Sequence, residues 1–177
     1  MPGLSTLRAA ASWVPRMTDL DAFLRWQCGP LVAIANRTAL AEWLVHRALG
    51  LDPGEHRREG ADLELPGGPI TLAVRSAAYL QSAQQTAPTA ISFPIEQRTA
   101  TAYVFCLLAE QDPARVNPQD LAQWRFWLVS TRRLHAERQS IGLQPLIRAH
   151  GEGLAYEQLG EAVEALAQPG LSTDLRN

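Results

Sequence analysis

The sequence predicts a single α/β domain in which a mixed central β-sheet is flanked by helices. Three patterns predict this class: a β-hairpin between residues 60 and 76, an apolar strand over 101–108, and amphipathic helical stretches on either side of them. The chain has 177 residues, of which 46% are hydrophobic and 19% are charged, as is typical of one globular domain. We place this domain at residues 19–167, between flexible arms at 1–18 and 168–177.

Two helices are expected before the hairpin. The first covers residues 19–35 and is interrupted near Gly29-Pro30, because proline lacks an N–H donor and disfavours helix in the residue before it. The second covers Thr38 to Leu49 and ends at Gly50. A charged loop then leads into the hairpin.

The hairpin is predicted from period-two alternation around the turn Pro66-Gly67-Gly68-Pro69. Its apolar face consists of Leu63, Leu65, Ile70, Leu72 and Val74. Its other face consists of Asp62, Glu64, Thr71, Ala73 and Arg75. If Leu65 pairs with Ile70, then Asp62 lies opposite Ala73, and Arg75 is one diagonal step away.

Five elements are expected after the hairpin: strands over 90–95, 101–108 and 124–129, a short helix over 131–137, and a C-terminal helix over 155–167. The strand over 101–108 is apolar almost throughout, so we expect it in the middle of the sheet with both faces covered. The C-terminal helix carries Leu159, Val163 and Leu166 on one face. The segment 77–85 is compatible with either a helix or a loop.

The strand from Trp124 to Val129 has bulky apolar side chains on both faces. Two interpretations are open. The strand is buried inside the chain, or one of its faces meets another subunit in a homo-oligomer, because aromatic residues concentrate at interfaces.

The hairpin also carries a family resemblance. An acidic Asp62 on the first strand is followed on the second by Ala73-Val74-Arg75 and then by Ser76-Ala77-Ala78-Tyr79-Leu80-Gln81-Ser82. This order resembles the core of the PD-(D/E)XK restriction-endonuclease-like nucleases, in which the second strand carries acid-x-Lys and the preceding helix commonly adds a glutamate. The resemblance covers residues 36–163. It implies a restriction-endonuclease-like fold, with the catalytic positions at Glu42, Asp62, Ala73, Arg75 and Gln81.

The departures from this pattern favour a loss of activity. Nucleases of this type use carboxylates to hold Mg²⁺, and Ala73 has none. Arg75 keeps a positive charge for a phosphate, but a guanidinium cannot act as a base at neutral pH. Asp62, Glu64 and Glu42 remain as metal ligands of a weak site, or of none. Returning a carboxylate by Ala73→Glu would place it opposite Asp62.

The composition limits the partners. A formal net charge of −2 gives no global basic field, so contact with DNA would be local, through Arg57, Arg58 and Arg75, and would be weak and salt-dependent. The two cysteines and four histidines have no metal-ligand spacing, so no cofactor is expected, apart from Mg²⁺ if the protein is active. No apolar run is long enough for a membrane span and no signal peptide is recognised, so we expect a cytoplasmic protein without membrane contact.

Three functions remain open on the sequence alone. The favoured one is a nuclease-fold protein with a degenerate active site that serves as a nucleic-acid-binding or structural subunit of a bacterial defence or DNA-processing assembly. The second is an active Mg²⁺-dependent endonuclease in which Glu64 is a migrated carboxylate. The third is a protein-interaction module. Analogy of fold cannot separate them.

Overall fold

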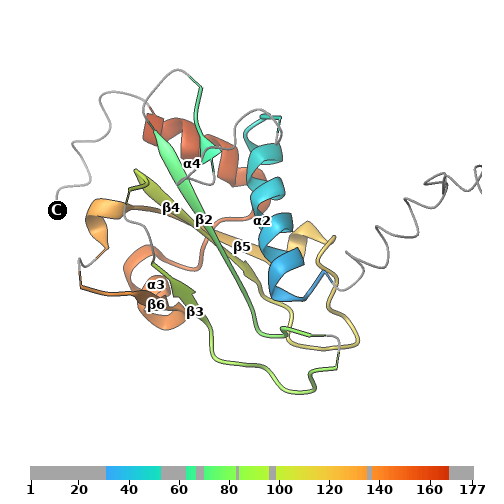
Figure 1. Cartoon of the computed structure of the whole chain (residues 1–177). Coiled ribbons are helices and arrows are strands. Elements are labelled where there is room, and N and C mark those ends of the chain that lie inside the picture. Colours follow the sequence, from blue (N-terminus) through green and yellow to red (C-terminus); the bar gives the residue numbers. More distant parts are fainter. Residues whose placement is uncertain are drawn as a thin grey trace, which may run out of the picture.

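A four-stranded mixed β-sheet forms the centre of the fold (Figure 1). The computed structural model describes residues 31–52, 63–66, 70–82, 84–95, 99–134 and 137–167. The strands of the sheet are β1 (Leu63–Glu64), β2 (Thr71–Ala78), β4 (Ala102–Leu108) and β5 (Trp124–Ser130), in the order β1-β2-β4-β5. The β2–β4 pair is parallel, and the β1–β2 and β4–β5 pairs are antiparallel. A second, two-stranded sheet pairs β3 (Ser92–Pro94) with β6 (Ser140–Gly142).

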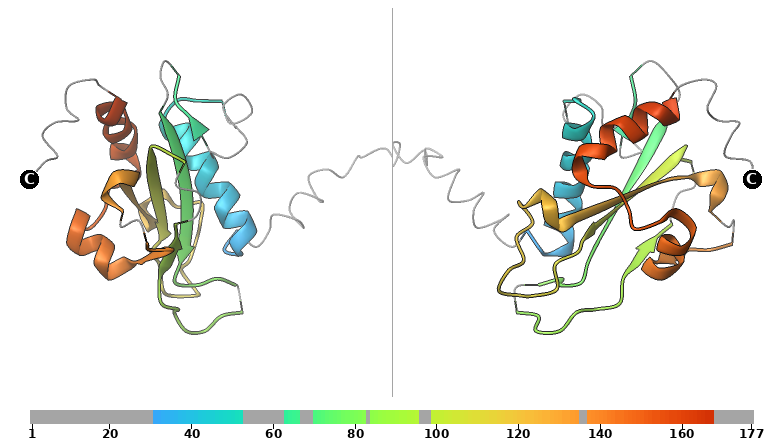
Figure 2. Two further views of the ribbon diagram at one scale, coloured as in Figure 1. Left: turned by 60° about the vertical axis from the view of Figure 1, so that its left-hand side comes forward. Right: turned by 180° about the vertical axis from the view of Figure 1, so that it is seen from behind.

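Within the described residues, three α-helices and two short 3₁₀ turns accompany the strands. They are α2 (Ile34–Ala48), η1 (Leu121–Gln123), η2 (Thr131–Arg133), α3 (Leu143–His150) and α4 (Tyr156–Ala167). In Figures 1 and 2, α2 runs beside β2, whereas α3 lies with β3 and β6 on the other side of the strands. The sheet is therefore covered on both sides.

Each face of the sheet has its own apolar core. On one face, Leu72, Val74, Val104 and Phe126 pack with side chains of α2 and α4. On the other face, the alternate residues of the same strands pack with β3, β6 and α3, and this second core includes Ala73, Tyr103, Phe105, Trp127 and Val129. Every residue of β4 is buried, as expected for a central strand covered on both faces.

A row of three threonines crosses one end of the sheet. Thr101 lies opposite Thr71, and the two exchange bonds between main-chain N–H and side-chain hydroxyl at 3.2 and 3.1 Å. The N–H of Thr131 donates to the Thr101 carbonyl at 3.1 Å, and its hydroxyl donates to the Ala100 carbonyl at 2.6 Å. These bonds fix the register of β2, β4 and β5, because a slip of one residue would send each apolar side chain to the opposite face.

Helix α4 packs closely against the end of α2. A Cβ atom at Gly160 would lie 2.7 Å from the carbonyl oxygen of Ala48, so only glycine allows this approach. Leu159 and Val163 are buried in the core beside it, and Leu166 packs against that core.

The architecture confirms much of what the sequence predicts. The chain forms one α/β domain with a mixed central sheet and flanking helices. The hairpin has the expected register, with Leu63 opposite Leu72 and the Leu65 N–H donating to the Ile70 carbonyl at 2.9 Å. Strand β4 is central, and α4 buries the expected side chains.

Other expectations were wrong. In place of a helix over 131–137, the described residues form only the turn η2, and they then lead into β6 and α3, which were not anticipated. Strand β3 is shorter than the expected strand. The described residues after Ala78 form a loop, which is one of the two alternatives left open for this segment. The second face of the hairpin was interpreted as a polar patch, but at Ala73 it is buried against aromatic residues. The expected helix over 19–35 and the two arms lie almost wholly outside the described residues.

The aromatic side chains of β5 are buried within the chain. Trp124 and Phe126 lie in the core beneath α2 and α4, and Trp127 and Val129 lie in the other core. Trp124 also donates from Nε1 to the Pro118 carbonyl at 2.9 Å. These side chains therefore form no exposed aromatic face of the kind that the subunit-interface interpretation requires.

Candidate functional site

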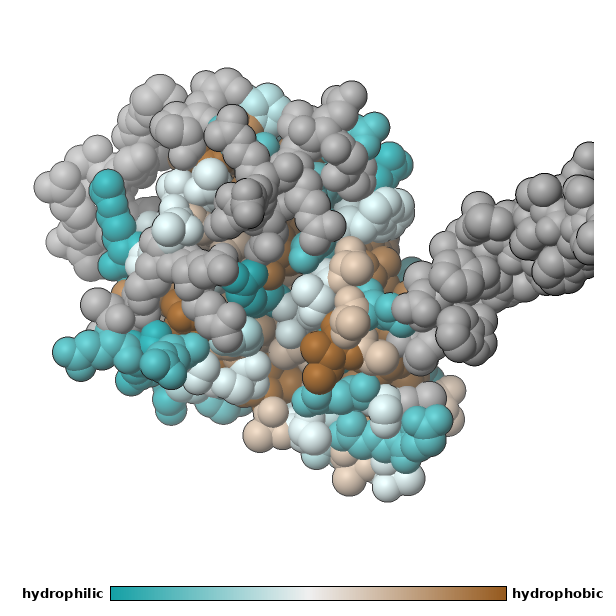
Figure 3. Space-filling model, in the orientation of Figure 1, coloured by the Kyte–Doolittle hydropathy of each residue, from teal (hydrophilic) through white to brown (hydrophobic). Residues whose placement is uncertain are grey.

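A pocket of about 510 Å³ lies along the outer edge of β2, and we call it the β2-edge pocket. Three parts of the chain contribute to it: the first half of α2, the second half of β2, and the segment that runs from Gln81 into β3. Its lining residues are Ile34, Arg37, Thr38, Glu42, Val74, Arg75, Ser76, Ala77, Ala78, Gln81, Ala90, Ile91, Ser92 and Pro94. Figure 3 shows apolar surface on this side, between α2 and the segment that leads into β3.

The pocket borders the part of β2 that follows its described pairing with β1. Among the described residues, β1 pairs with β2 only at Thr71 and Leu72. Further along β2, the main-chain groups of alternate residues point away from β4, toward this pocket. The carbonyl of Val74 accepts from Arg75 Nη1 at 2.7 Å, and the hydroxyls of Ser76 and Thr38 are 3.0 Å apart, which joins β2 to α2.

Arg37 is the buried cation of this pocket. Only 3% of its surface is exposed, and its Nη1 donates to the Val32 carbonyl at 2.7 Å. Within the described residues, its Nε has no hydrogen-bond partner. Burial lowers the pKa of Arg37 from its usual value, because the charged form loses solvation. A buried N–H donor without an acceptor is costly, so an anion in the pocket would relieve this cost.

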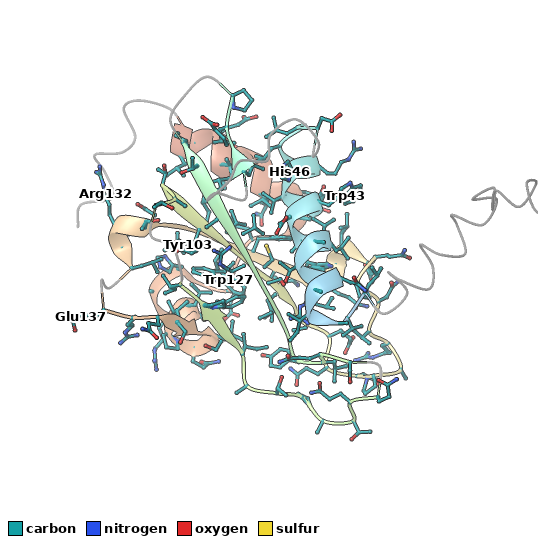
Figure 4. The ribbon with its side chains drawn as sticks, in the orientation of Figure 1. Trp43, His46, Tyr103, Trp127, Arg132 and Glu137 are labelled. Atoms are coloured by element: carbon teal, nitrogen blue, oxygen red, sulfur yellow. The ribbon has the colours of Figure 1, made fainter. Side chains whose placement is uncertain are left out.

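Arg75 supplies a second guanidinium from the strand. Its Cζ lies 5.7 Å from the centre of the Tyr103 ring, a cation–π distance. Figure 4 shows Tyr103 and Trp127 close together beside the sheet. Both aromatic residues are buried, so the Arg75 side chain rests on a rigid wall. This position suits a group that holds an anion in a fixed place.

Gln81 lines the pocket from a loop that is held by hydrogen bonds. Its Nε2 donates to the Thr89 hydroxyl at 3.1 Å, and its N–H donates to the Gln85 side chain at 2.8 Å. Gln85 and Thr89 in turn both donate to the Tyr79 carbonyl. These hydrogen bonds hold Gln81 at the pocket, although it lies in neither a helix nor a strand.

Glu42 lines the pocket from α2 and is the one carboxylate among the lining residues that the structure describes. Burial raises the pKa of the Cys106 thiol, and the negative charge of Glu42 raises it further. The Glu42 side chain therefore lies close enough to β4 to influence a buried thiol, which makes Cys106 a poor nucleophile.

Three of the five catalytic positions from the resemblance therefore meet in one pocket: Glu42, Arg75 and Gln81. Ala73 does not line it, since its methyl group points into the core beside Tyr103. Glu64 is paired with Thr71, about 13 Å along β2 from Arg75 at the usual rise per residue. Asp62, Arg57 and Arg58 lie outside the described residues.

The sequence analysis missed Arg37. One signal could have found it, because Arg37 precedes Ala41 and Val45 at intervals of four along α2, and both of these are buried. A cation on the buried stripe of a helix requires a special environment.

Comparison with known proteins identifies no relative of this chain. No family model matches it, and neither a curated protein nor a solved structure matches it. None of the described helices is long and apolar enough to cross a membrane. Among the described residues, no group of three or more histidine, cysteine, aspartate or glutamate side chains could hold a metal ion.

We expect Mg²⁺ or Mn²⁺ to bind in the millimolar range or more weakly. Among the described lining residues, Glu42 alone offers a carboxylate, and Arg37 and Arg75 line the same pocket, whereas magnesium usually requires one or two well-placed carboxylates. Isothermal titration calorimetry with Mn²⁺ measures this directly. A micromolar site that disappears in both Glu42→Gln and Asp62→Ala would contradict the expectation.

Proposed function

We propose that this chain is a non-catalytic nucleic-acid-binding protein whose β2-edge pocket holds a backbone phosphate. The observation that carries the proposal is the convergence of Arg37 and Arg75 on one pocket. Arg37 is buried with an unsatisfied Nε, and Arg75 is held on the Tyr103 ring. Guanidinium groups suit phosphate oxygens because they offer several planar donors and keep their charge.

The proposal includes the fold type. We infer a restriction-endonuclease-like domain, because helix α2, the β1–β2 hairpin and the loop after β2 bring Glu42, Arg75 and Gln81 to one pocket. Glu42 lies on a different element, far in the sequence from the other two residues, so its convergence with Arg75 and Gln81 supports the resemblance more strongly than the short motif does. A role as a subunit of a bacterial defence or DNA-processing assembly is part of the same proposal.

The absence of catalysis follows from two side chains. Ala73 offers only a methyl group, which is packed in the core, and Arg75 cannot remove a proton from water at neutral pH. Glu64 as a migrated ligand has little support, because its partner on β2 is Thr71 and it does not line the pocket. Among its described residues, the pocket has two guanidiniums that suit a phosphate, and Glu42 is the one carboxylate left to act on water.

A protein-interaction module is the second candidate, and one observation favours it. On α2, Ile34 is 60% exposed and Trp43 is 48% exposed, and Arg47 lies over the Trp43 ring at 5.8 Å. Figure 4 shows Trp43 on the side of α2 away from the sheet. Large exposed apolar residues are common at interfaces. If nucleic acid does not bind, this face becomes the leading candidate.

The test is replacement of Arg75 by alanine. We expect binding to single-stranded and duplex DNA at ~50 mM salt to weaken about tenfold, because one charge-assisted contact is lost. The slope of log K against log salt should fall by about one phosphate contact. Fluorescence anisotropy with labelled 20-nucleotide probes at several salt concentrations measures both quantities.

Arg125→Ala is the matched control. Arg125 lies on β5, is exposed, and donates from Nη1 to the carbonyl of the preceding residue at 2.7 Å, as Arg75 does on β2. It lines neither of the two pockets described here. Equal losses in both variants would indicate a non-specific charge effect, and a wild-type protein that binds no DNA at ~50 mM salt would overturn the proposal.

A further inference from the structure

A second cavity, of about 300 Å³, lies between η2 and α3, and we call it the arginine pocket. Its lining residues are Ile95, Arg133, Leu134, Arg138, Ile141, Pro145, Arg148, Ala149 and His150. Four of these can carry positive charge, and among the lining residues that the structure describes there is no aspartate or glutamate. The sequence analysis did not anticipate this cluster, because its cations come from three separate segments.

The cations that line the cavity come from three segments of the chain. Arg133 ends η2, Arg138 lies in the segment before β6, and Arg148 and His150 stand in the last turn of α3. The end of α3 explains part of the cluster, since the helix dipole stabilises basic side chains near a helix C-terminus. It does not explain Arg133 and Arg138, which lie outside the helix.

The charges are close enough to influence one another. Partial burial lowers the pKa of His150, and the positive charge of Arg133 lowers it further. Arg133 therefore lies near the imidazole ring of His150, although the two residues come from different elements. Mutual repulsion of this kind is relieved when an anion enters.

The remaining wall is apolar and rigid. Leu134, Ile141 and Ile95 are buried in the second core, and the Ile95 N–H donates to the Gln139 carbonyl at 2.7 Å. A cavity with apolar walls and a few convergent charged groups is the usual form of a site for a small ligand. The cationic groups would fix the charged end of the ligand, and the apolar wall would contact its body.

We propose that the arginine pocket binds a dianionic phosphate monoester carried on a small, partly apolar body. Two sources share this chemistry: a free nucleoside monophosphate and the 5′-terminal phosphate of a nucleic acid. Arg133 and Arg138 also interact with other groups of the protein, so the ligand would share them. Arg148 and His150 complete the set. The site has no residue in common with the β2-edge pocket, so it does not depend on the proposed function.

Calorimetric titration of the full chain tests the proposal with four probes: adenosine 5′-monophosphate, adenosine, and one short oligonucleotide with and without a 5′-phosphate. Binding of the monophosphate but not of adenosine identifies a free nucleotide as a source. Tighter binding of the phosphorylated oligonucleotide than of its unphosphorylated form identifies a nucleic-acid end. If the phosphate makes no difference in either pair, the proposal is wrong.

Matched variants locate the site. Arg133→Gln and Arg148→Gln should each weaken binding of the phosphorylated probe about tenfold, whereas Arg125→Gln should leave it unchanged. All three arginines are exposed, so the variants should fold. The bound phosphate should also raise the pKa of His150, which NMR titration follows through a ring signal that is absent in His150→Gln. Equal weakening by Arg125→Gln, or a His150 signal that does not respond to a bound probe, would overturn the proposal.

Discussion

Replacing Ala73 by glutamate is expected to destabilise the protein by about 3 kcal/mol more than replacing it by glutamine, and not to restore cleavage of DNA. Ala73 is 3% exposed and packs in the core with Tyr103 and Phe105. Glutamate and glutamine have nearly the same volume, so both variants carry the same cost of overpacking. The difference between them is the cost of a buried charge.

The pH dependence of the free energy of unfolding separates the cost of the buried charge from the cost of the added volume. Burial raises the folded-state pKa of the introduced carboxyl above its unfolded value of about 4.3. The excess destabilisation of Ala73→Glu is therefore complete above the folded-state pKa. It declines as the pH falls, and is absent near pH ~4, where the carboxyl is neutral in both states. Urea denaturation of both variants between pH ~4 and ~8 measures this difference.

The companion measurement is plasmid cleavage with Mg²⁺ by Ala73→Glu, by Arg75→Lys and by the double variant. We expect no cleavage by any of them. If Ala73→Glu is as stable as Ala73→Gln at neutral pH and the double variant cleaves DNA, the carboxylate has reached the β2-edge pocket. That result would confirm a degenerate nuclease site, and it would confirm the register in which Asp62 lies opposite residue 73.

Replacing Gly153 by alanine is expected to lower the free energy of unfolding by about 3 kcal/mol. Gly153 has a φ of +87°, which alanine adopts only with strain, and an added Cβ would lie 2.7 Å from two atoms of the Trp127 ring. Trp127 cannot easily move, because it is buried and its Nε1 donates to the Gly151 carbonyl at 2.8 Å. Urea denaturation of the variant gives the value.

Gly151→Ala is the matched control for this experiment. Gly151 has a similar φ of +80°, but a Cβ there would meet nothing within 4 Å. It should cost only the backbone strain, about 1 to 2 kcal/mol. If the two variants lose equal stability, the Trp127 ring can move away from the added methyl group, and the close contact at Gly153 does not contribute to the destabilisation.

The sheet could be predicted from the sequence because its signals are local. The alternation around the Pro66 to Pro69 turn is enough to pair Leu63 with Leu72, and the apolar run through Val104 is enough to place β4 in the centre. Helix α3 was missed for a physical reason: it is short, contains Pro145 and buries chiefly Leu146. Its amphipathic pattern is too brief to stand out from a loop.

The two pockets could be predicted only in part. Glu42, Arg75 and Gln81 were found because a motif placed them together, and the fold does bring them to one pocket. The burial of Ala73 could not be read from the hairpin, because the layer that covers it comes from β3, β6 and α3, which follow later in the chain. The arginine pocket is wholly tertiary, since no sequence spacing joins Arg133 to Arg148.

The threonine row has a consequence for the newly made chain. Thr71, Thr101 and Thr131 are spaced thirty residues apart, so β2 has no neighbour on its β4 side until the chain has been made through Leu108. Closing each loop of this length costs about 3 kcal/mol in chain entropy before any strand pairing repays it. Until then, both faces of β2 expose apolar side chains, from Leu72 to Ala78. On the ribosome, this stretch is therefore where the chain most needs protection from aggregation.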